Sequence, residues 1–392
     1  MDISEIRVKE HFGLVSNNTS TSQFSFLVSP PKNRKSIEKR DIVCFDHPMY
    51  GEGCQVFAEV SEITSYEQVA GSTIGERVGK MLATSRIIGY TDTRNDKRSM
   101  LMQELLVPPN PGSRVYMPYA KFLEDVFSRR SDGGEYAQPL YLGKAEMMAA
   151  SKETAVQEIN FYLDAADLAR KNTLIAAIDG AGKTYTSEVM IEEIADKASY
   201  PIIVLESRTE YETMEASSKP DLGCKANYQK EIISSSKSSA DAIAKRVDRG
   251  RVIIVNAESM AFEEKNEYFA SVLSELAKTM REKAGQPFLL IVEEAESLSY
   301  QVLQDIISTK KEIGIILISS HPIMLGEKIL SQIQNFVIGK TYDAKDLAFF
   351  KNVFVGNEQS LSDLNTGEWM IGGLNVVRPT KIHVREICSR QK

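Results

Sequence analysis

The chain has 392 residues, which is too long for one ordinary hydrophobic core, so we expect two domains. Hydrophobic residues make up 42% of the chain and charged residues 26%, as is typical of soluble globular proteins. The net charge of −7 argues against a protein that coats nucleic acid with its whole surface, since such proteins are basic. Any contact with DNA or RNA is therefore expected to be local.

The sequence pattern favours a cytoplasmic protein without membrane contact. The N-terminus is charged where a signal peptide needs an apolar run. The longest apolar stretches, residues 288–292 and 313–318, are far shorter than the roughly 20 residues that span a bilayer. The cysteines show no CxxC spacing, which fits reduced thiols better than a zinc site or a disulfide framework. They are Cys44, Cys54, Cys224 and Cys388.

Residues 1–150 carry short β-rich runs that are separated by turn residues. The runs lie at residues 24–28, 41–45, 55–60, 86–90 and 102–106. Short strands at such regular spacing are typical of a small barrel. Residues 128–139, with Gly133 and Gly134, are predicted to be a flexible connection. We therefore expect an N-terminal β-barrel domain, including its linker, up to residue 150.

Residues 151–392 show a different pattern, in which apolar strands alternate with amphipathic helices. Strands are predicted at residues 173–178, 201–205, 251–256, 288–292 and 314–319, and helices at residues 183–197 and 262–283. Nearly continuous apolar runs between such helices indicate a largely parallel sheet that is covered on both faces. We expect an α/β domain with a RecA-like P-loop NTPase core.

A glycine-rich segment joins the first of these strands to the first helix. Ala177-Ile-Asp-Gly-Ala-Gly-Lys-Thr184 fits the pattern G-x-x-x-x-G-K-[ST] everywhere except at its first position. Gly180 and Gly182 let the backbone curl so that N–H groups point at phosphate oxygens. The helix N-terminus that follows favours the same anions. A chance glycine-rich turn is the alternative, and the strand before the loop and the helix after it favour phosphate binding.

The loop predicts ATP and Mg²⁺ as ligands. Lys183 would contact the β- and γ-phosphates, and the Thr184 hydroxyl would bind Mg²⁺. The predicted nucleotide contacts are Asp179, Gly180, Ala181, Gly182, Lys183, Thr184 and Tyr185.

Two carboxylates follow the strand at residues 288–292. In an enzyme of this kind the first acid holds the Mg²⁺ shell, and the second polarises the attacking water. Glu293 would take the first role and contact Mg²⁺ through a water molecule. Its side chain is one methylene longer than that of the usual aspartate. Glu294 is the predicted general base. The alternative is a solvated acidic helix start, since Glu296 follows closely.

Polar residues also end the strand at residues 314–319. Ser319, Ser320 and His321 would sense the γ-phosphate, or the serines would only cap the strand end; both interpretations stay open. The sequence does not select an arginine to act on a neighbouring subunit from Arg170, Arg249, Arg251, Arg281 and Arg378. The lysines of a loop-rich stretch would contact nucleic acid or form a solvated surface; they are Lys225, Lys230 and Lys237.

Taken together, these motifs resemble the HerA-like ATPases, relatives of the FtsK translocases. The resemblance covers nearly the whole chain. Residues 11–143 look like the small β-barrel of that family, residues 163–170 resemble the segment before its phosphate loop, and residues 201–211 resemble its strand ending in D-P-H-G-E-Y. Later segments resemble its D-E-A-H region (residues 288–296), S-Q-R-P region (318–322), L-S-Q segment (330–334) and closing hairpin (364–373).

The resemblance implies a hexameric ring that hydrolyses ATP and moves double-stranded DNA through its centre. In this family the barrel typically helps to dock a partner, such as the nuclease NurA of archaeal DNA end processing, and some relatives serve in bacterial antiviral systems. We therefore expect a helicase-like DNA translocase that works with a nuclease or another effector in DNA repair.

The chain departs from the family pattern at several site positions and keeps it at others. It departs at Ala177, Glu206, Glu293, Glu296, Ser320 and His321, and it keeps Lys183, Thr184, Glu294, Glu210 and Tyr211. Two other hypotheses stay open. The departures motivate a nucleotide-stabilised assembly platform with little or no hydrolysis. The acidic net charge suggests a translocase for RNA or polypeptide.

Overall fold

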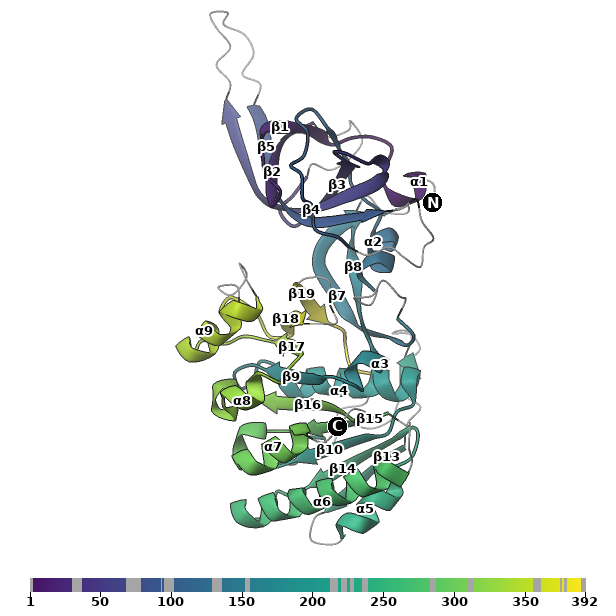
Figure 1. Cartoon of the computed structure of the whole chain (residues 1–392), viewed down its shortest axis with the longest axis vertical. Helices are drawn as coiled ribbons and strands as arrows, with labels where there is room; N and C mark the ends of the chain where they lie inside the picture. The colour runs from purple at the N-terminus through teal and green to yellow at the C-terminus, as the bar shows by residue number, and fades with distance from the viewer. Residues whose placement is uncertain are drawn as a thin grey trace, which may run out of the picture. The chain divides into compact units, whose positions relative to one another are not determined.

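The computed structural model of the chain comprises two compact units (Figure 1). The structure describes residues 3–29, 37–67, 79–92, 94, 102–128, 136–151, 156–211, 218–219, 224–225, 229–234, 239–282, 287–308, 313–354, 361–373, 376 and 379–388. The first unit contains Met1–Glu135 and Lys144–Phe161, and the second contains Tyr136–Gly143 and Tyr162–Lys392. The chain thus changes unit three times, at Tyr136, within β7 (Pro139–Ala150) and within β8 (Val156–Asp164). The expected division at residue 150 lies between the second and the third of these changes.

The first unit is built on a six-stranded antiparallel sheet in the order β3-β4-β5-β2-β1-β6. The strands are β1 (Gly13–Thr19), β2 (Gln23–Val28), β3 (Ile42–His47), β4 (Gly51–Glu67), β5 (Gly79–Asp92) and β6 (Arg114–Val115). The two edges meet where Cys44 of β3 and Tyr116, just after β6, exchange backbone hydrogen bonds of 2.7 and 2.8 Å. The sheet is therefore a nearly closed barrel, as the sequence predicts.

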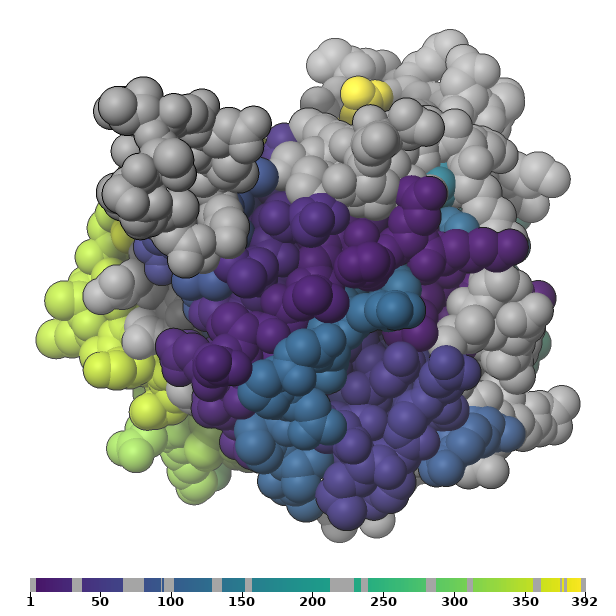
Figure 2. Space-filling model, turned by 90° about the horizontal axis from the view of Figure 1, so that it is seen from above, coloured from purple at the N-terminus to yellow at the C-terminus, as the bar shows by residue number. Residues whose placement is uncertain are grey.

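Apolar side chains that alternate along these strands fill the barrel. Phe24 and Phe45 meet edge to face with ring centroids 5.0 Å apart, and both are almost fully buried. Two short helices, α1 (Ile3–Ile6) and α2 (Ala120–Phe127), complete the unit. Figure 2 shows the purple N-terminal segment beside the blue segment near residue 115, where the N–H of Phe12 donates to the carbonyl of Val115.

One strand prediction in this unit is wrong. Residues 102–106 form no strand and pair with β5 only at Gln103, opposite Tyr90. The physical reason is that β5 already pairs with β4 along one edge and, from Leu82 to Arg86, with β2 along the other. Because β2 reaches only to Arg86 along that edge, a short free stretch is left at Tyr90. The predicted runs at residues 55–60 and 86–90 lie inside the much longer β4 and β5.

The second unit contains an eleven-stranded sheet in the order β13-β14-β10-β15-β16-β9-β17-β18-β19-β7-β8. The parallel strands are β9 (Asn172–Ala176), β10 (Ile202–Glu206), β13 (Gln229–Ser234), β14 (Arg251–Asn256), β15 (Phe288–Val292), β16 (Ile313–Ser319) and β17 (Asn335–Ile338). They continue into antiparallel β18 (Glu368–Gly373) and β19 (Thr380–Val384). Every residue of β10, β15 and β16 is buried, which confirms the predicted buried and mostly parallel sheet.

Helices connect the parallel strands. They are α3 (Ala165–Leu168), α4 (Lys183–Glu193), α5 (Ala240–Arg246), α6 (Phe262–Glu282), α7 (Tyr300–Ser308), α8 (Glu327–Leu330) and α9 (Ala344–Val353). Residues of α5 to α9 share one apolar cluster with one face of the strands, and α5 to α8 follow one another along the sheet in Figure 1. Short elements are η2 (Ile194–Ala198), which continues α4, η6 (Ala295–Ser297), η7 (Pro322–Leu325) and the pair β11 (Ser218–Lys219) and β12 (Cys224–Lys225).

The cysteines differ from the expectation of four reduced thiols. Cys44 and Cys54 are free and buried, and burial raises the pKa of the Cys44 thiol to about 12. Cys388 is disulfide-bonded, so the expectation is wrong at this residue. Spacing along the chain does not show which cysteines the fold brings together. In the part of the chain that the structure describes, no helix is long and apolar enough to cross a membrane.

Candidate functional site

The strand order brings four loops to one edge of the sheet in the second unit. β16 lies between β9 and β15, and β10 lies on the other side of β15. Because these strands are parallel, their carboxyl ends meet at the same edge, where ligands bind in open α/β sheets. The loop after β9, the acids after β15 and the serines after β16 therefore meet at one place, together with the turn after β10.

The glycine-rich loop after β9 has the backbone that its sequence requires. Gly180 and Gly182 have φ angles of 77° and 98°, which a residue with a side chain rarely adopts. Gly182 is the N-cap of α4, so the loop leads directly into the free N–H groups of the helix. Both glycines leave the space around the loop open.

Ala177 replaces the first glycine of the pattern without distorting the loop. It is not among the residues with positive φ, and its N–H donates to the carbonyl of Ser319. Its methyl group lies against Gly339, where an added Cβ would come within 2.9 Å of it. Gly339 therefore provides the room that the alanine side chain needs.

Lys183 lies over the loop with its ammonium group already partnered. Its Nζ donates to the carbonyls of Ala177 and Ile178 at 3.1 and 3.3 Å and lies 3.0 Å from Oδ1 of Asp179. Ser320 donates to the same Asp179 oxygen at 2.5 Å. These hydrogen bonds, first that of Ser320, lower the pKa of Asp179. The Asp179 carboxylate thus pairs with the Lys183 ammonium group, for which a bound phosphate group would compete.

Thr184 faces two carboxylates. Its hydroxyl hydrogen-bonds Glu210 and lies 3.2 Å from Oε1 of Glu293. Glu293 is only 3% exposed, and its Oε2 is buried with no hydrogen-bond partner among the described residues. Burial, followed by the nearby charge of Glu210, raises the pKa of Glu293 to about 8. A divalent cation would relieve both effects, since it supplies positive charge and a partner for the orphaned oxygen.

The oxygen atoms of this group fit Mg²⁺. Carboxylate and hydroxyl oxygens are the donors that Mg²⁺ prefers, and the ion usually takes only one or two carboxylates beside substrate phosphates and water. Among the described residues no group of three or more acidic, histidine or cysteine side chains forms a metal site. Thr184, Glu210 and Glu293 would therefore hold the ion together with the nucleotide.

Glu294 lies next to Glu293 in an unusual backbone conformation. Its φ and ψ are 47° and 50°, in the left-handed region that side chains seldom adopt. Such backbone strain clusters at functional sites. Its Oε1 accepts from Nε of Arg208 at 2.8 Å. Partial burial raises the pKa of Glu294, and the charge of Arg208 opposes that shift.

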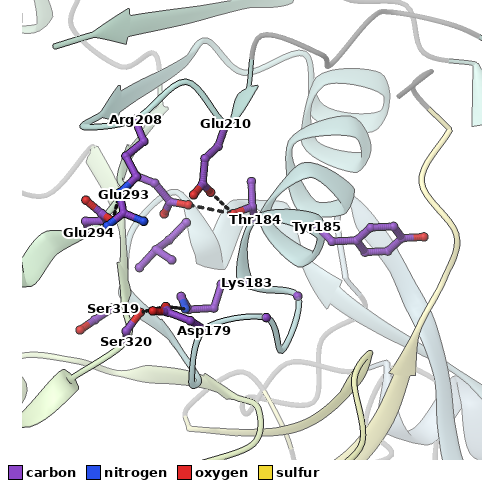
Figure 3. A pocket seen from close by; sticks show the side chains of 13 residues that line it. Asp179, Lys183, Thr184, Tyr185, Arg208, Glu210, Glu293, Glu294, Ser319 and Ser320 are labelled. Carbon is purple, nitrogen blue, oxygen red and sulfur yellow. Dashed lines mark hydrogen bonds and ion pairs between the residues drawn. The ribbon is translucent and has the colours of Figure 1, made fainter. Parts of the chain in front are cut away.

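One cavity of about 330 Å³ collects these side chains (Figure 3). It is lined by Asp179, Gly180, Gly182, Lys183, Thr184, Tyr185, Arg208, Glu210, Glu293, Glu294, Ile318, Ser319 and Ser320. The predicted nucleotide contacts all line it except Ala181, which is a buried residue of the loop, and so do Glu293, Glu294, Ser319 and Ser320. The predicted Tyr185 extends toward the C-terminal segment in Figure 3, and its hydroxyl accepts from the N–H of Ile387 at 2.9 Å.

Several predicted residues lie elsewhere. His321 is exposed and does not line the cavity. Arg170, Arg249 and Arg251 do not line the cavity either. Lys230 lies on the edge strand β13. Arg378, Lys237 and the side chains of Arg281 and Lys225 lie outside the described residues.

Sequence reasoning missed two side chains of the cavity. Arg208 and Glu210 follow β10, and both line the cavity beside the acids of β15. The available signal was the polar segment directly after a buried strand, which is the same signal that identified Glu293 and Glu294. Glu210 was noted only as a residue that keeps the family pattern.

The C-terminal segment fastens to α4, the helix that follows the loop. Arg385 lies 3.1 Å from Oε2 of Glu192 and 3.0 Å from Oε1 of Glu193, and the three side chains are only 3–8% exposed. The N–H of Cys388 also donates to Glu192 at 2.9 Å. Burial raises the pKa of Glu193, and Arg385 opposes that shift. The arginine therefore neutralises two acids that would otherwise be costly to bury.

Replacing Arg385 with methionine is expected to lower the free energy of unfolding by about 3 kcal/mol, because it leaves two buried carboxylates without a cation. Urea denaturation of the purified protein measures this loss. The control is Arg246→Met, which breaks an ion pair with Glu231 that is about 40% exposed and should cost less than about 1 kcal/mol. Equal losses in the two variants would contradict a stabilising role for the buried contact.

A comparison with protein families bears on this site. Residues 147–312 match the family model described as Helicase HerA, central domain. This part of the chain is therefore similar to the central domain of HerA-type helicases. The match includes the glycine-rich loop, Glu210 and both acids after β15. The match agrees with the resemblance to HerA-like ATPases that the motifs of the sequence show.

Solved structures with a similar fold are distant in sequence. VirB4 of Thermoanaerobacter pseudethanolicus is 11% identical over 64% of this chain and 97% of that chain, with a TM-score of 0.44. The genome packaging NTPase B204 from Sulfolobus turreted icosahedral virus 2, in complex with AMPPCP, is 11% identical over 55% and 98%, with a TM-score of 0.41. The pCW3 conjugation coupling protein TcpA with ATPγS is 10% identical over 93% and 89%, with a TM-score of 0.38. Comparison with curated proteins finds no match.

Proposed function

We propose that this protein is an ATP-hydrolysing motor of the HerA type that moves double-stranded DNA as a homo-oligomeric ring of six subunits. The observation that carries the proposal is the cavity in which Lys183 and Thr184 of the loop meet Glu293 and Glu294. A cation-bearing phosphate loop and a strand-end carboxylate pair in one cavity are what hydrolysis of a nucleoside triphosphate requires.

Each group of the cavity has a role in this proposal. The loop N–H groups and Lys183 bind the phosphates, and Thr184, Glu210 and Glu293 would hold Mg²⁺, which neutralises phosphate charge when bound. Glu294 accepts a proton from water as the water oxygen bonds to the γ-phosphorus and the bond from that phosphorus to ADP breaks. Ser320, which donates to Asp179 of the loop, would contact the γ-phosphate.

The polymer and the partner are part of the same proposal. We propose DNA because residues 147–312 match the model of the HerA central domain, and a nuclease of the NurA type or another effector as partner because of the barrel that precedes this segment. An arginine from a neighbouring subunit would complete the site in the ring. These proposals rest on the match to the HerA family model and not on the net charge, which argues against a protein that coats nucleic acid with its whole surface.

The decisive experiment is an ATPase assay on the purified protein without polymer and then with double-stranded DNA, single-stranded DNA and RNA. We expect hydrolysis that double-stranded DNA stimulates. Stimulation by another polymer alone would identify a different translocase. Nucleotide-dependent ring assembly without hydrolysis under any of these conditions would favour the assembly platform.

Asp179 offers a test of the loop. Replacing Asp179 with asparagine is expected to tighten ATP binding about two- to fivefold, because Lys183 loses a competing partner and the phosphates lose a repelling charge. Calorimetric titration with ATPγS measures the change. Asp241→Asn is a matched control, since Asp241 forms an exposed pair with Lys245 at the same spacing, away from the cavity. Weaker binding by Asp179→Asn would instead show that the aspartate supports the bound nucleotide.

A further inference from the structure

Arg208 is a cation of the cavity that no step of the proposed function has used. It follows β10 by two residues, and its side chain is 65% exposed. Its Nε lies 2.8 Å from Oε1 of Glu294, so in this structure it is paired with the proposed general base. Figure 3 shows the arginine reaching from the turn after β10 toward that carboxylate.

The backbone that carries Arg208 is anchored on both sides. Glu206 is fully buried, and its carboxylate accepts from Asn256 at 2.7 Å and from the N–H of Tyr211 at 3.2 Å. Tyr211 is fully buried as well, and its hydroxyl lies 2.6 Å from that of Ser187 on α4. Arg208 thus has a backbone that is held in place and an exposed side chain that packing does not hold in one position.

The charge of Arg208 already extends to the phosphate loop. It contributes to the lowered pKa of Asp179, which lies on that loop. The cavity is lined by four acidic side chains, Asp179, Glu210, Glu293 and Glu294, and by two cations, Lys183 and Arg208. A triphosphate adds several negative charges to this set and therefore competes with Glu294 for the arginine.

The competition favours the phosphate. A guanidinium group forms paired hydrogen bonds with a phosphate group, whose charge exceeds that of a carboxylate. The present contact with Glu294 runs through Nε of a mostly exposed side chain, and exposed ion pairs are weak. When the arginine leaves, Oε1 of Glu294 is free to accept a hydrogen bond from water.

We propose that Arg208 exchanges between two anions: it holds Glu294 while the γ-phosphate position is empty, and it binds the γ-phosphate when a nucleoside triphosphate is present. Arg208 is thus a positioning residue for the base and a residue that distinguishes triphosphate from diphosphate. This inference rests on the proposed function, since it assumes a nucleotide in this cavity. The exchange would release Glu294 for proton transfer only when the γ-phosphate, the group to be cleaved, is present.

The first test measures affinity without catalysis. Wild-type protein, Arg208→Gln and Arg208→Lys are titrated with ATPγS and with ADP. Arg208→Gln should bind ATPγS roughly tenfold more weakly and ADP within about twofold of wild type, and Arg208→Lys should recover part of the difference. Since Arg208 is mostly exposed, the variants are expected to fold normally. Arg246→Gln, at an exposed arginine on α5, is the control and should change neither affinity.

The second test follows the arginine itself by phenylglyoxal modification, with Arg208 quantified by mass spectrometry. ATPγS should protect Arg208 at least several-fold more than ADP does, and Glu294→Gln should speed its modification in the nucleotide-free protein. Equal protection by the two nucleotides, or an equal loss of both affinities in Arg208→Gln, would overturn the exchange while leaving nucleotide binding intact. A wild-type protein that binds neither nucleotide would overturn the proposed function together with the exchange.

Discussion

Lys183→Ala is expected to lower the affinity for ATPγS and ADP by at least roughly 100-fold, because it removes the cation that faces the phosphates from a mostly buried position. The Lys183 side chain is only 13% exposed, so its charge is poorly screened by water. Its Nζ bridges the start of the loop through Ala177 and Ile178. Phosphates that enter the loop would therefore meet this ammonium group at short range. Calorimetric titration of the purified variant measures the loss.

The control for this prediction is Lys245→Ala, which removes an exposed lysine of α5 and should bind nucleotide as wild type does. Lys183→Arg keeps the charge but changes its shape, and it should retain intermediate affinity. Thermal unfolding of each variant shows whether the loop contacts of Lys183 also matter for stability. Near-normal affinity in a folded Lys183→Ala protein would mean that the nucleotide does not bind at this loop.

Much of the second unit could be predicted because each element carries its own local signal. Buried strands such as β15 are continuous apolar runs, and functional residues follow directly at their ends. The left-handed backbone of Gly180 and Gly182 is likewise a local requirement that the sequence shows. The prediction of Lys183, Thr184, Glu293 and Glu294 as one group then needed only the rule that parallel strands end at one edge.

The side chains that were missed depend on strand order, which a single sequence does not show. Arg208 lies beside Glu294 because β10 is the neighbour of β15, although β16 and α7 follow β15 along the chain. Ala177 likewise departs from the first glycine of the pattern, and Gly339, which lies against it, is 162 residues later in the chain. A departure from a motif and its compensation can thus be far apart in sequence and adjacent in the fold.

The same limit applies to the first unit and to the C-terminal segment. The barrel was predicted from regular strand spacing, but its closure depends on Cys44 meeting Tyr116 across 72 positions of chain. The contact of Arg385 with Glu192 and Glu193 spans almost 200 residues and has no periodic signal. Pairings at such separations follow from topology, and local propensity does not encode them.

Glu294→Gln is expected to keep the affinity for ATPγS within about threefold of wild type and to slow hydrolysis by roughly 10²- to 10⁴-fold, the usual contribution of a general base. Glutamine has the size of glutamate and can still accept from Arg208, so the cavity should keep its shape. It cannot accept the proton of the attacking water at neutral pH. Single-turnover hydrolysis of ATP bound to the purified protein separates this chemical step from binding and release.

Glu275→Gln, at an acidic residue of α6 that does not line the cavity, is the control and should hydrolyse ATP as wild type does. If Glu294→Gln hydrolyses ATP normally, Glu294 is not the base, and Glu293 becomes the next candidate. Glu293 and Glu294 are also expected to differ in their effect on Mg²⁺ binding. Because Glu293 lies against Thr184 in the proposed Mg²⁺ site, Glu293→Gln should also weaken Mg²⁺-dependent nucleotide binding, whereas Glu294→Gln should not. If Glu294→Gln loses hydrolysis but keeps nucleotide binding, the proton transfer is assigned to Glu294, and the binding of Mg²⁺ is assigned to other residues.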